Sequence, residues 1–193
     1  PIEAWNNRIR RMVKKKLEEG ENLTYRGVFE YVYNDHHTRI CNTFNEAYVQ
    51  WIIKSIASKT GKGPSEIKLL DPSSGWGDRL IGSYAAGIAE YKGYDPNPQL
   101  TPLYGNIISH FGINNKMKAE ILELPFEESD DRVNYYDIVF TSPPYFAYEI
   151  YGWSDGQSVT RYPEYDEWIK YMYRPYIRKA YEYLRKGLSL IHI

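Results

Sequence analysis

The sequence has little that would place it in a membrane or cross-link it covalently. Its one cysteine, Cys41, excludes a disulfide within the chain and is typical of a reducing compartment. No apolar run approaches the ~18 residues that a membrane-spanning helix needs, and no secretion signal is visible after the first residue, Pro1. We therefore expect a cytoplasmic protein, or a virus-encoded intracellular one, with no membrane partner.

The sequence also lacks a large net charge. A formal charge of −1 argues against a basic coat over the whole surface, but it leaves a local basic patch open. One such patch comprises six basic residues with no acid among them: Arg8, Arg10, Arg11, Lys14, Lys15 and Lys16. On a helix these side chains could contact phosphates. Alternatively, the segment is a solvated amphipathic helix.

Strand-like and helix-like segments alternate along the chain after residue 44. The expected strands are 67–70, 91–94, 116–121 and 137–141, and the expected helices are 45–58, 80–89, 100–111 and 165–184, the last bent at Pro175. This order predicts an α/β fold, a parallel sheet with right-handed crossovers and helices on both faces. In such sheets ligands bind beyond the carboxyl ends of the strands, and each motif below falls at such an end.

The first motif, residues 71–77, follows the first expected strand and reads Asp-Pro-Ser-Ser-Gly-Trp-Gly. Gly75 and Gly77 can take positive φ and let the backbone approach a ligand closely. The helix that follows offers N–H groups at the positive end of its dipole. Since the third glycine of the dinucleotide fingerprint and the lysine of a phosphate-binding loop are absent, the pattern favours a cofactor without a pyrophosphate. The alternative is an ordinary tight turn.

Two acidic residues follow at neighbouring strand ends. Asp95, before Pro96, ends the second expected strand, where its carboxylate could accept hydrogen bonds from two ribose hydroxyls. Its alternative is an Asp-Pro turn. Glu120 ends the third expected strand with Ile121. The Glu120 carboxylate could accept from an exocyclic amine while the Ile121 N–H donates to a ring nitrogen, and the alternative is a surface acid.

The fourth expected strand runs into Ser142-Pro143-Pro144-Tyr145, followed by Phe146. Each proline fixes its own φ, removes an N–H and favours an extended residue before it, which makes a stiff elbow. A planar amine in this elbow could donate to the Ser142 hydroxyl and to the Pro143 carbonyl while its ring stacks on Tyr145. The alternative is a proline-terminated strand followed by a core tyrosine.

Together these motifs resemble the Rossmann-like S-adenosylmethionine-dependent methyltransferases, specifically those that methylate exocyclic amines of DNA bases, over residues 40–187. The resemblance implies a cofactor site made of Phe44, Asp71, Ser73, Gly75, Gly77, Asp95, Pro96, Glu120 and Ile121. It implies that Ser142, Pro143, Pro144 and Tyr145 are catalytic and that Tyr145 and Phe146 contact the substrate. The Ser-Pro-Pro-Tyr form is most like the cytosine N4 enzymes, and the adenine N6 enzymes share the scaffold.

The implied reaction moves a methyl group from S-adenosyl-L-methionine to cytosine N4 or adenine N6, with DNA as partner and no metal. The target base would be flipped out of the duplex. Two alternatives stay open: a methyltransferase of the same fold that acts on RNA bases or on a protein glutamine, and a non-catalytic relative that binds the cofactor. No covalent intermediate is needed, so we assign no nucleophile.

The resemblance also implies about two strands and a helix more than the chain holds. Residues 184–187 are similar to the turn that precedes the family's fifth strand. The last six residues, 188–193, are what a transposase end sequence used in DNA library preparation encodes. We therefore expect a helical, basic extension over 1–40, an incomplete catalytic domain over 41–187 and a non-native tail over 188–193.

Overall fold

The computed structural model describes residues 10–11, 13–20, 44–147 and 156–192, in two units that divide after Thr43. Much of the expected extension, including Arg8, lies outside the described residues, and so does Cys41. In the first unit residues 10–11 and 13–18 are helical, as the sequence predicts. Two basic side chains of the patch form i,i+4 ion pairs with glutamates, Lys14 with Glu18 and Lys15 with Glu19, each at 3.9 Å. Such pairs are typical of a solvated helix face.

The second unit is built on a parallel sheet, which confirms the predicted α/β class. Its five strands lie in the order β3-β2-β1-β4-β5. They are β1 (Lys68–Asp71), β2 (Glu90–Tyr94), β3 (Lys118–Leu122), β4 (Tyr136–Thr141) and β5 (Leu184–His192). The chain runs from β1 outward to β3 and then returns to β4 on the other side of β1. The strand order therefore reverses between β1 and β4, and their carboxyl ends form a topological switch point.

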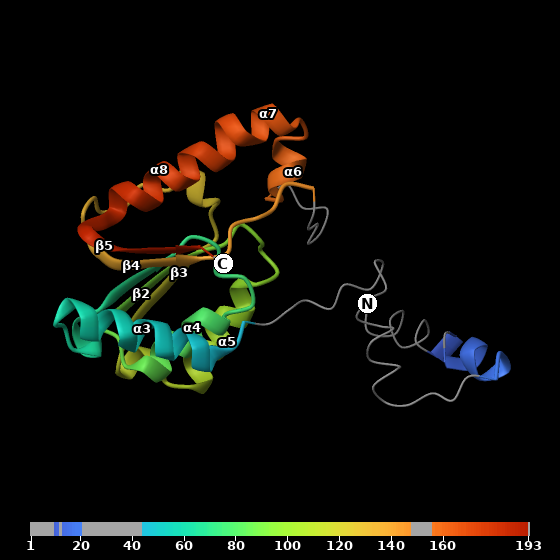
Figure 1. Cartoon of the computed structure of the whole chain (residues 1–193), viewed down its shortest axis with the longest axis horizontal. Helices are drawn as coiled ribbons and strands as arrows, with labels where there is room; N and C mark the ends of the chain where they lie inside the picture. The colour runs from blue at the N-terminus through green and yellow to red at the C-terminus, as the bar shows by residue number, and fades with distance from the viewer. Residues whose placement is uncertain (1–9, 12, 21–43, 148–155, 193) are drawn as a thin grey trace. The chain divides into compact units, whose positions relative to one another are not determined.

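Helices cover both faces of this sheet (Figure 1). One face carries α3 (Glu46–Thr60), α4 (Asp78–Ala86) and α5 (Thr101–His110). The other carries α6 (Ser158–Arg161), α7 (Tyr165–Glu167), the π-helical segment η4 (Trp168–Tyr173) and α8 (Arg174–Tyr183). Three short 3₁₀ turns complete the connections: η1 (Pro64–Glu66), η2 (Ile113–Asn115) and η3 (Phe126–Glu128).

Two apolar clusters lie on either side of the sheet because successive side chains of a strand point to opposite faces. In β1, Leu69 packs toward α3 and α4, whereas Leu70 packs toward α8. Phe140 and Val139 of β4 divide in the same way. All four side chains are fully buried. The central strands read as continuous apolar runs for this reason, as parallel strands covered on both faces do.

The long helix expected over 165–184 is interrupted rather than simply bent. Residues 168–173 form a π-helical segment directly before Arg174 and Pro175, which open α8. Pro175 has no N–H to donate to the carbonyl of Tyr171, four residues earlier. A wider π turn, with i→i+5 hydrogen bonds, lets the helix continue past this missing donor.

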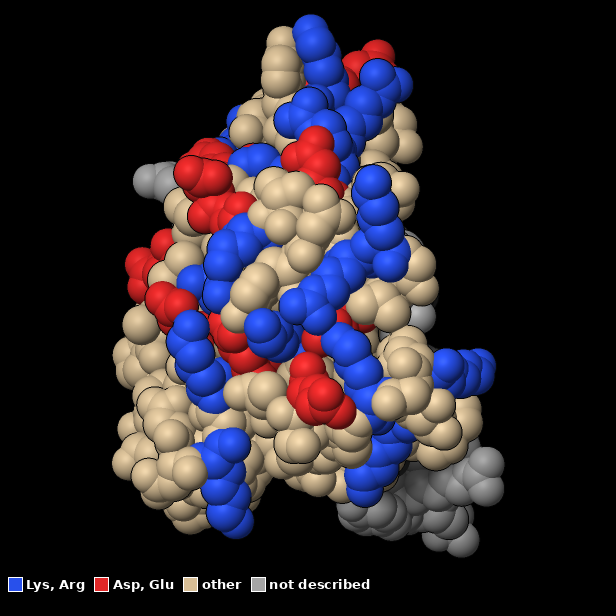
Figure 2. Space-filling view, turned by 90° about the vertical axis from the view of Figure 1, so that its left-hand side faces the viewer, with Lys and Arg blue, Asp and Glu red and all other residues tan. Residues whose placement is uncertain are grey.

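The residues expected to form a tail take part in the sheet. Ser189, Leu190 and Ile191 of β5 lie opposite Ile138, Val139 and Phe140 of β4. This pairing engages backbone groups, so it does not test the origin of residues 188–193, which stays a prediction. Among the described residues no helix is both long and apolar enough to span a bilayer. On the face shown in Figure 2, basic and acidic side chains are interspersed.

Helices α3 and α4 pack closely because Gly82 has no side chain. A Cβ on Gly82 would lie 2.5 Å from Val49 Cβ and 2.9 Å from the Glu46 carbonyl oxygen. We expect Gly82→Ala to lower the free energy of unfolding in urea by about 1–3 kcal/mol through overpacking. Gly105→Ala is the matched control, since nothing lies within 4 Å of that position in α5. It should be neutral or stabilise by about 0.5–1 kcal/mol, and equal effects would contradict this account.

Candidate functional site

The carboxyl edge of the sheet brings the predicted motifs together. The 71–77 loop (residues 71–77) follows β1, and the 142–145 elbow (residues 142–145) follows β4, so both lie at the switch point between these strands. The loop then crosses over β2, where the Ser74 N–H donates to the Tyr94 carbonyl at 2.9 Å. This crossing depends on Gly93, because a Cβ there would overlap the Ser74 hydroxyl.

Asp71 is the last residue of β1 and the first of the 71–77 loop, and its side chain is fully buried (0% exposed). Its Oδ2 accepts hydrogen bonds from Arg79 Nε and from the Tyr91 hydroxyl, each at 2.7 Å. Arg79 also donates to the Ser73 carbonyl, and the Ser73 N–H donates to Asp71 Oδ1 at 3.2 Å. Burial by itself would lower the pKa of Arg79. The neighbouring Asp71 carboxylate outweighs this effect, so the pKa of Arg79 lies above its ordinary value and the guanidinium stays charged. The carboxylate is thus engaged in holding the loop, and its predicted contact with a cofactor stays a prediction.

Gly75 and Asp95 are in direct contact. The Gly75 N–H donates to Asp95 Oδ2 at 2.9 Å, and the Gly75 carbonyl accepts from the Tyr104 hydroxyl at 2.6 Å. Asp95 Oδ1 accepts the Asn97 N–H at 2.9 Å. Burial raises the pKa of Asp95 above its ordinary value, although the N–H donors of Asn97 and Gly75 oppose the shift. Pro96 follows in the same loop, where its carbonyl lies close to Gly156.

Gly77 and Phe44 lie at the start of α4. Gly77 is the N-cap with φ +90°, and a Cβ there would lie 2.8 Å from Ile107 Cδ1. The backbone conformation therefore favours glycine here, and a larger residue would also have to displace the end of the Ile107 side chain in α5. The Phe44 N–H donates to Asp78 Oδ2 at 2.9 Å, and its ring packs edge-on against Phe140 at 5.6 Å. The predicted cofactor contact of Phe44 stays a prediction.

In the 142–145 elbow Pro143 is buried, whereas the Tyr145 ring is 39% exposed. Within the described part of the chain no hydrogen bond engages the Ser142 hydroxyl. Phe146 has φ +43°, a left-handed conformation that is rare for a bulky residue and that tends to occur at functional sites. Its ring packs against Trp168 of the π-helical segment at 5.7 Å. Phe146 thus anchors the elbow to the core, and its contact with substrate stays a prediction.

One tyrosine joins the two motifs, a residue that sequence reasoning missed. The Tyr176 hydroxyl is hydrogen-bonded to Ser73 Oγ at 2.8 Å and to Thr141 Oγ1 at 2.6 Å. Arg79, Tyr91 and Tyr104 were missed as well. All four reach the site from helices or from a neighbouring strand, so no local pattern in the sequence marks them.

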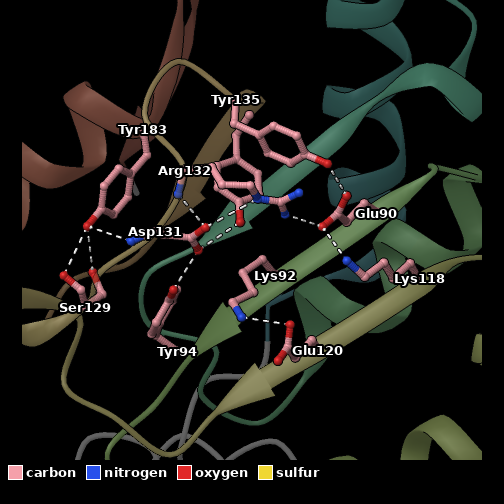
Figure 3. A network of polar contacts seen from close by, with 11 residues as sticks. Glu90, Lys92, Tyr94, Lys118, Glu120, Ser129, Asp131, Arg132, Tyr135 and Tyr183 are labelled. Carbon is pink, nitrogen blue, oxygen red and sulfur yellow. Dashed lines mark hydrogen bonds and ion pairs between the residues drawn. The ribbon is translucent and has the colours of Figure 1, made fainter.

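The expected position of Glu120 at the end of the third strand is wrong. β3 continues to Leu122, because Ile121 and Leu122 still pair with Gly93 and Tyr94 of β2. Leu122 is therefore the β3 residue beside Asp95, whose N–H donates to the Leu122 carbonyl at 3.0 Å. The Glu120 side chain lies 2.8 Å from Lys92 Nζ in an ion pair, and Figure 3 shows both in a network of polar side chains. Ile121 packs against the apolar cluster under α3 and α4.

Asp131 is another carboxylate of this network, which also contains Glu90 (Figure 3). It accepts hydrogen bonds from the hydroxyls of Tyr94 at 2.7 Å and Tyr136 at 2.9 Å. Burial alone would raise the pKa of Asp131, but these donors and the Arg132 N–H outweigh it, so the pKa lies below its ordinary value. Because the network contains no reactive group beyond paired charges, we assign it a structural role.

No protein-family model matches the sequence, and the search of curated proteins gives no match. Solved structures do share the fold. One is a candidate S-adenosyl-L-methionine-dependent methyltransferase from Methanococcus maripaludis (15% identity, 89% of this chain and 65% of that one, TM-score 0.52). The others are an S-adenosylmethionine-dependent O-methyltransferase from Thermotoga maritima (13%, 83% and 48%, 0.52) and an S-adenosylmethionine-dependent methyltransferase from Clostridium acetobutylicum (11%, 85% and 55%, 0.54).

The fold of this chain is therefore the Rossmann-like fold of these methyltransferases, as the sequence predicts. The identities of 11–15% show the fold alone. The chain spans about half to two thirds of the length of these structures. Among the described residues no group of His, Cys, Asp and Glu could hold a metal ion.

The pairing of Asp71 with Arg79 predicts an unequal response to two substitutions. Asp71→Asn leaves Arg79 buried without a counter-charge and should lower the free energy of unfolding in urea by about 3–5 kcal/mol. Tyr91→Phe removes only one hydroxyl from the same carboxylate and should cost about 1–3 kcal/mol. If Asp71→Asn proved no worse than Tyr91→Phe, the charge pair would not be what holds the loop.

The lowered pKa of Asp131 predicts a pH-dependent contribution to stability. The contribution is complete above the unfolded carboxyl pKa of about 3.9 and is lost as pH falls through the lower pKa of the folded state. Tyr136→Phe should therefore cost about 1.5–3 kcal/mol at pH 7, and the cost should shrink toward pH 2. Urea unfolding at both pH values measures this, with the exposed Tyr181→Phe as control. A cost that does not change with pH would contradict it.

Proposed function

We propose that this chain transfers a methyl group from S-adenosyl-L-methionine to an exocyclic amine of a DNA base, cytosine N4 or adenine N6. One observation carries the proposal: the rigid 142–145 elbow lies at the switch point of a methyltransferase fold, beside the 71–77 loop. The elbow supplies two hydrogen-bond acceptors and an aromatic ring for a planar amine, and the 71–77 loop suits a cofactor that lacks a pyrophosphate.

The residues of the 71–77 loop fit such a cofactor. A Cβ on Gly75 would meet only the Ser73 carbonyl, at 3.9 Å, so this side of the backbone is open to a ligand. The Asp95 carboxylate accepts two N–H groups, one on each oxygen. An ionised carboxylate has about four acceptor sites, which leaves capacity for the two hydroxyls of a ribose. The cofactor's chemistry is an activated methyl group on a sulfonium.

The 142–145 elbow fits an aromatic amine. The lone pair of such an amine is delocalised into its ring, which makes it a poor nucleophile. The Ser142 hydroxyl oxygen and the Pro143 carbonyl can accept its two N–H hydrogens and draw them out of the ring plane, which localises the lone pair on the nitrogen for attack on the sulfonium methyl. Tyr145 can stack on the base and offset part of the cost of flipping it out of a duplex. These residues mainly orient the reactants, an effect that is large when reacting atoms are held in line.

Glu120 is the weakest part of the proposed cofactor site, because its side chain is paired with Lys92. We retain Asp95, Gly75, Gly77, Ser73 and Phe44 as the residues to test first. Asp71 acts beneath the loop, through Arg79.

The test is transfer of a labelled methyl group from S-adenosyl-L-methionine to DNA, followed by mass spectrometry of the nucleosides for N4-methylcytosine and N6-methyladenine. RNA and protein substrates run in parallel. Methylated RNA bases or glutamine in place of DNA bases would replace the substrate but keep the reaction class. Cofactor binding with no transfer to any substrate would favour a non-catalytic relative and overturn the proposal.

Ser142→Ala should lower kcat by about 100-fold, since one of the two acceptors that orient the amine is lost. The dissociation constant for the cofactor should stay within about twofold, since the substitution removes no proposed cofactor contact. The matched control is Ser58→Ala on the exposed surface of α3, which should leave both values unchanged. Stopped-time methyl-transfer assays and calorimetric cofactor titration give the two measurements. An unchanged kcat in Ser142→Ala would remove the serine from the mechanism.

A further inference from the structure

Tyr176 lies outside both motifs and contacts each of them. Its side chain extends from α8 to the carboxyl edge of the sheet and is 1% exposed. The ring packs edge-on against Phe126 at 5.0 Å. The hydroxyl meets two partners, Ser73 Oγ at 2.8 Å and Thr141 Oγ1 at 2.6 Å. A phenol has one hydrogen to donate and lone pairs to accept with, so both contacts can form at once.

The two partners belong to the two motifs. Thr141 is the last residue of β4 and directly precedes Ser142. Ser73 lies in the 71–77 loop, two residues before Gly75. One buried oxygen atom therefore touches both the loop proposed to hold the cofactor and the strand end that carries the proposed acceptor.

Strand pairing does not by itself set the separation of these motifs. β1 and β4 pair at Leu69 with Ile138 and at Leu70 with Val139. Beyond that point β1 and β4 no longer pair with each other: Asp71 pairs with Gly93 of β2, whereas Phe140 and Thr141 pair with β5. The Tyr176 hydroxyl joins the two segments again past the residues that pair with one another, between the 71–77 loop and the strand end that precedes the 142–145 elbow. A misplacement of about 1 Å between reacting groups can cost about 100-fold in rate.

We propose that Tyr176 is a positioning residue, which holds the 71–77 loop and the 142–145 elbow at the separation that methyl transfer needs. This inference rests on the proposed function. It assigns Tyr176 no contact with substrate or cofactor. It acts through Ser73 and Thr141.

Tyr176→Phe keeps the ring packing and removes only the hydroxyl bridge. We expect kcat to fall by about tenfold or more while the dissociation constant for S-adenosyl-L-methionine and the KM for the nucleic acid stay within about threefold. Tyr183→Phe is the matched control: Tyr183 is also buried, contacts Phe126 at 5.9 Å, and donates its hydroxyl to the Ser129 carbonyl at 3.0 Å, away from both motifs. Tyr183→Phe should lower the free energy of unfolding about as much as Tyr176→Phe does, but it should leave kcat unchanged.

Hydrogen exchange of backbone amides gives a second readout that does not need activity. In Tyr176→Phe the amides of Ser73, Ser74 and Ser142 should lose protection together, whereas Tyr183→Phe should leave them unchanged. Thr141→Val removes only the hydrogen bond between Thr141 and Tyr176, and it tests the inference independently should Tyr176→Phe fail to fold. Its effect on kcat should disappear when it is combined with Tyr176→Phe.

Three outcomes would overturn the inference. These are an unchanged kcat in Tyr176→Phe, an equal loss of kcat in Tyr183→Phe, and full additivity of Thr141→Val with Tyr176→Phe. A parent chain that methylates neither DNA, RNA nor protein would instead overturn the proposed function. The exchange comparison would then decide whether Tyr176 couples the two motifs.

Discussion

The buried ion pair between Asp71 and Arg79 is the interaction on which the rest of the carboxyl edge depends. Asp71 ends the central strand β1, and Arg79 lies in the first turns of α4, so the pair connects the strand to the helix beneath the 71–77 loop. Arg79 extends the link to the Ser73 carbonyl. With the base of the loop held, Gly75 can present its N–H to Asp95. Two buried charges are costly to desolvate, and their location under a loop indicates that they fix a conformation.

The overall fold could be predicted from the sequence because its signals are local. Apolar strands such as β4 and turn residues such as Gly77 are visible in short windows, and strand ends in a parallel sheet meet at one edge. From this rule we expected Gly75 and Asp95 to lie in one site, and the structure shows them in contact. The strand ends themselves were less certain: the third strand was expected to end with Glu120 and Ile121, yet backbone pairing with β2 carries β3 on to Leu122.

The contacts that join the site could not be predicted, because they connect residues far apart in the chain. Tyr176 lies about a hundred positions from Ser73, and its spacing in α8 is that of an ordinary buried tyrosine. Tyr104 reaches the Gly75 carbonyl from α5 in the same way. The π-helical segment before Pro175 also escaped prediction, since a proline in a helix predicts a bend and only the packed structure shows how the bend is absorbed.

Among the described residues, tyrosine hydroxyls add to the Asp71–Arg79 pair as internal polar contacts of the carboxyl edge. Tyr91, Tyr104 and Tyr176 hold the carboxyl edge, while most ion pairs lie nearer the surface. A neutral phenol bond inside the protein is little affected by dissolved ions, whereas exposed charges are screened over about 10 Å at 0.1 M salt. Attachment to a phosphate backbone weakens steeply with salt. If the proposed function holds, raising the salt concentration should release the nucleic acid while the buried hydrogen bonds of the carboxyl edge persist.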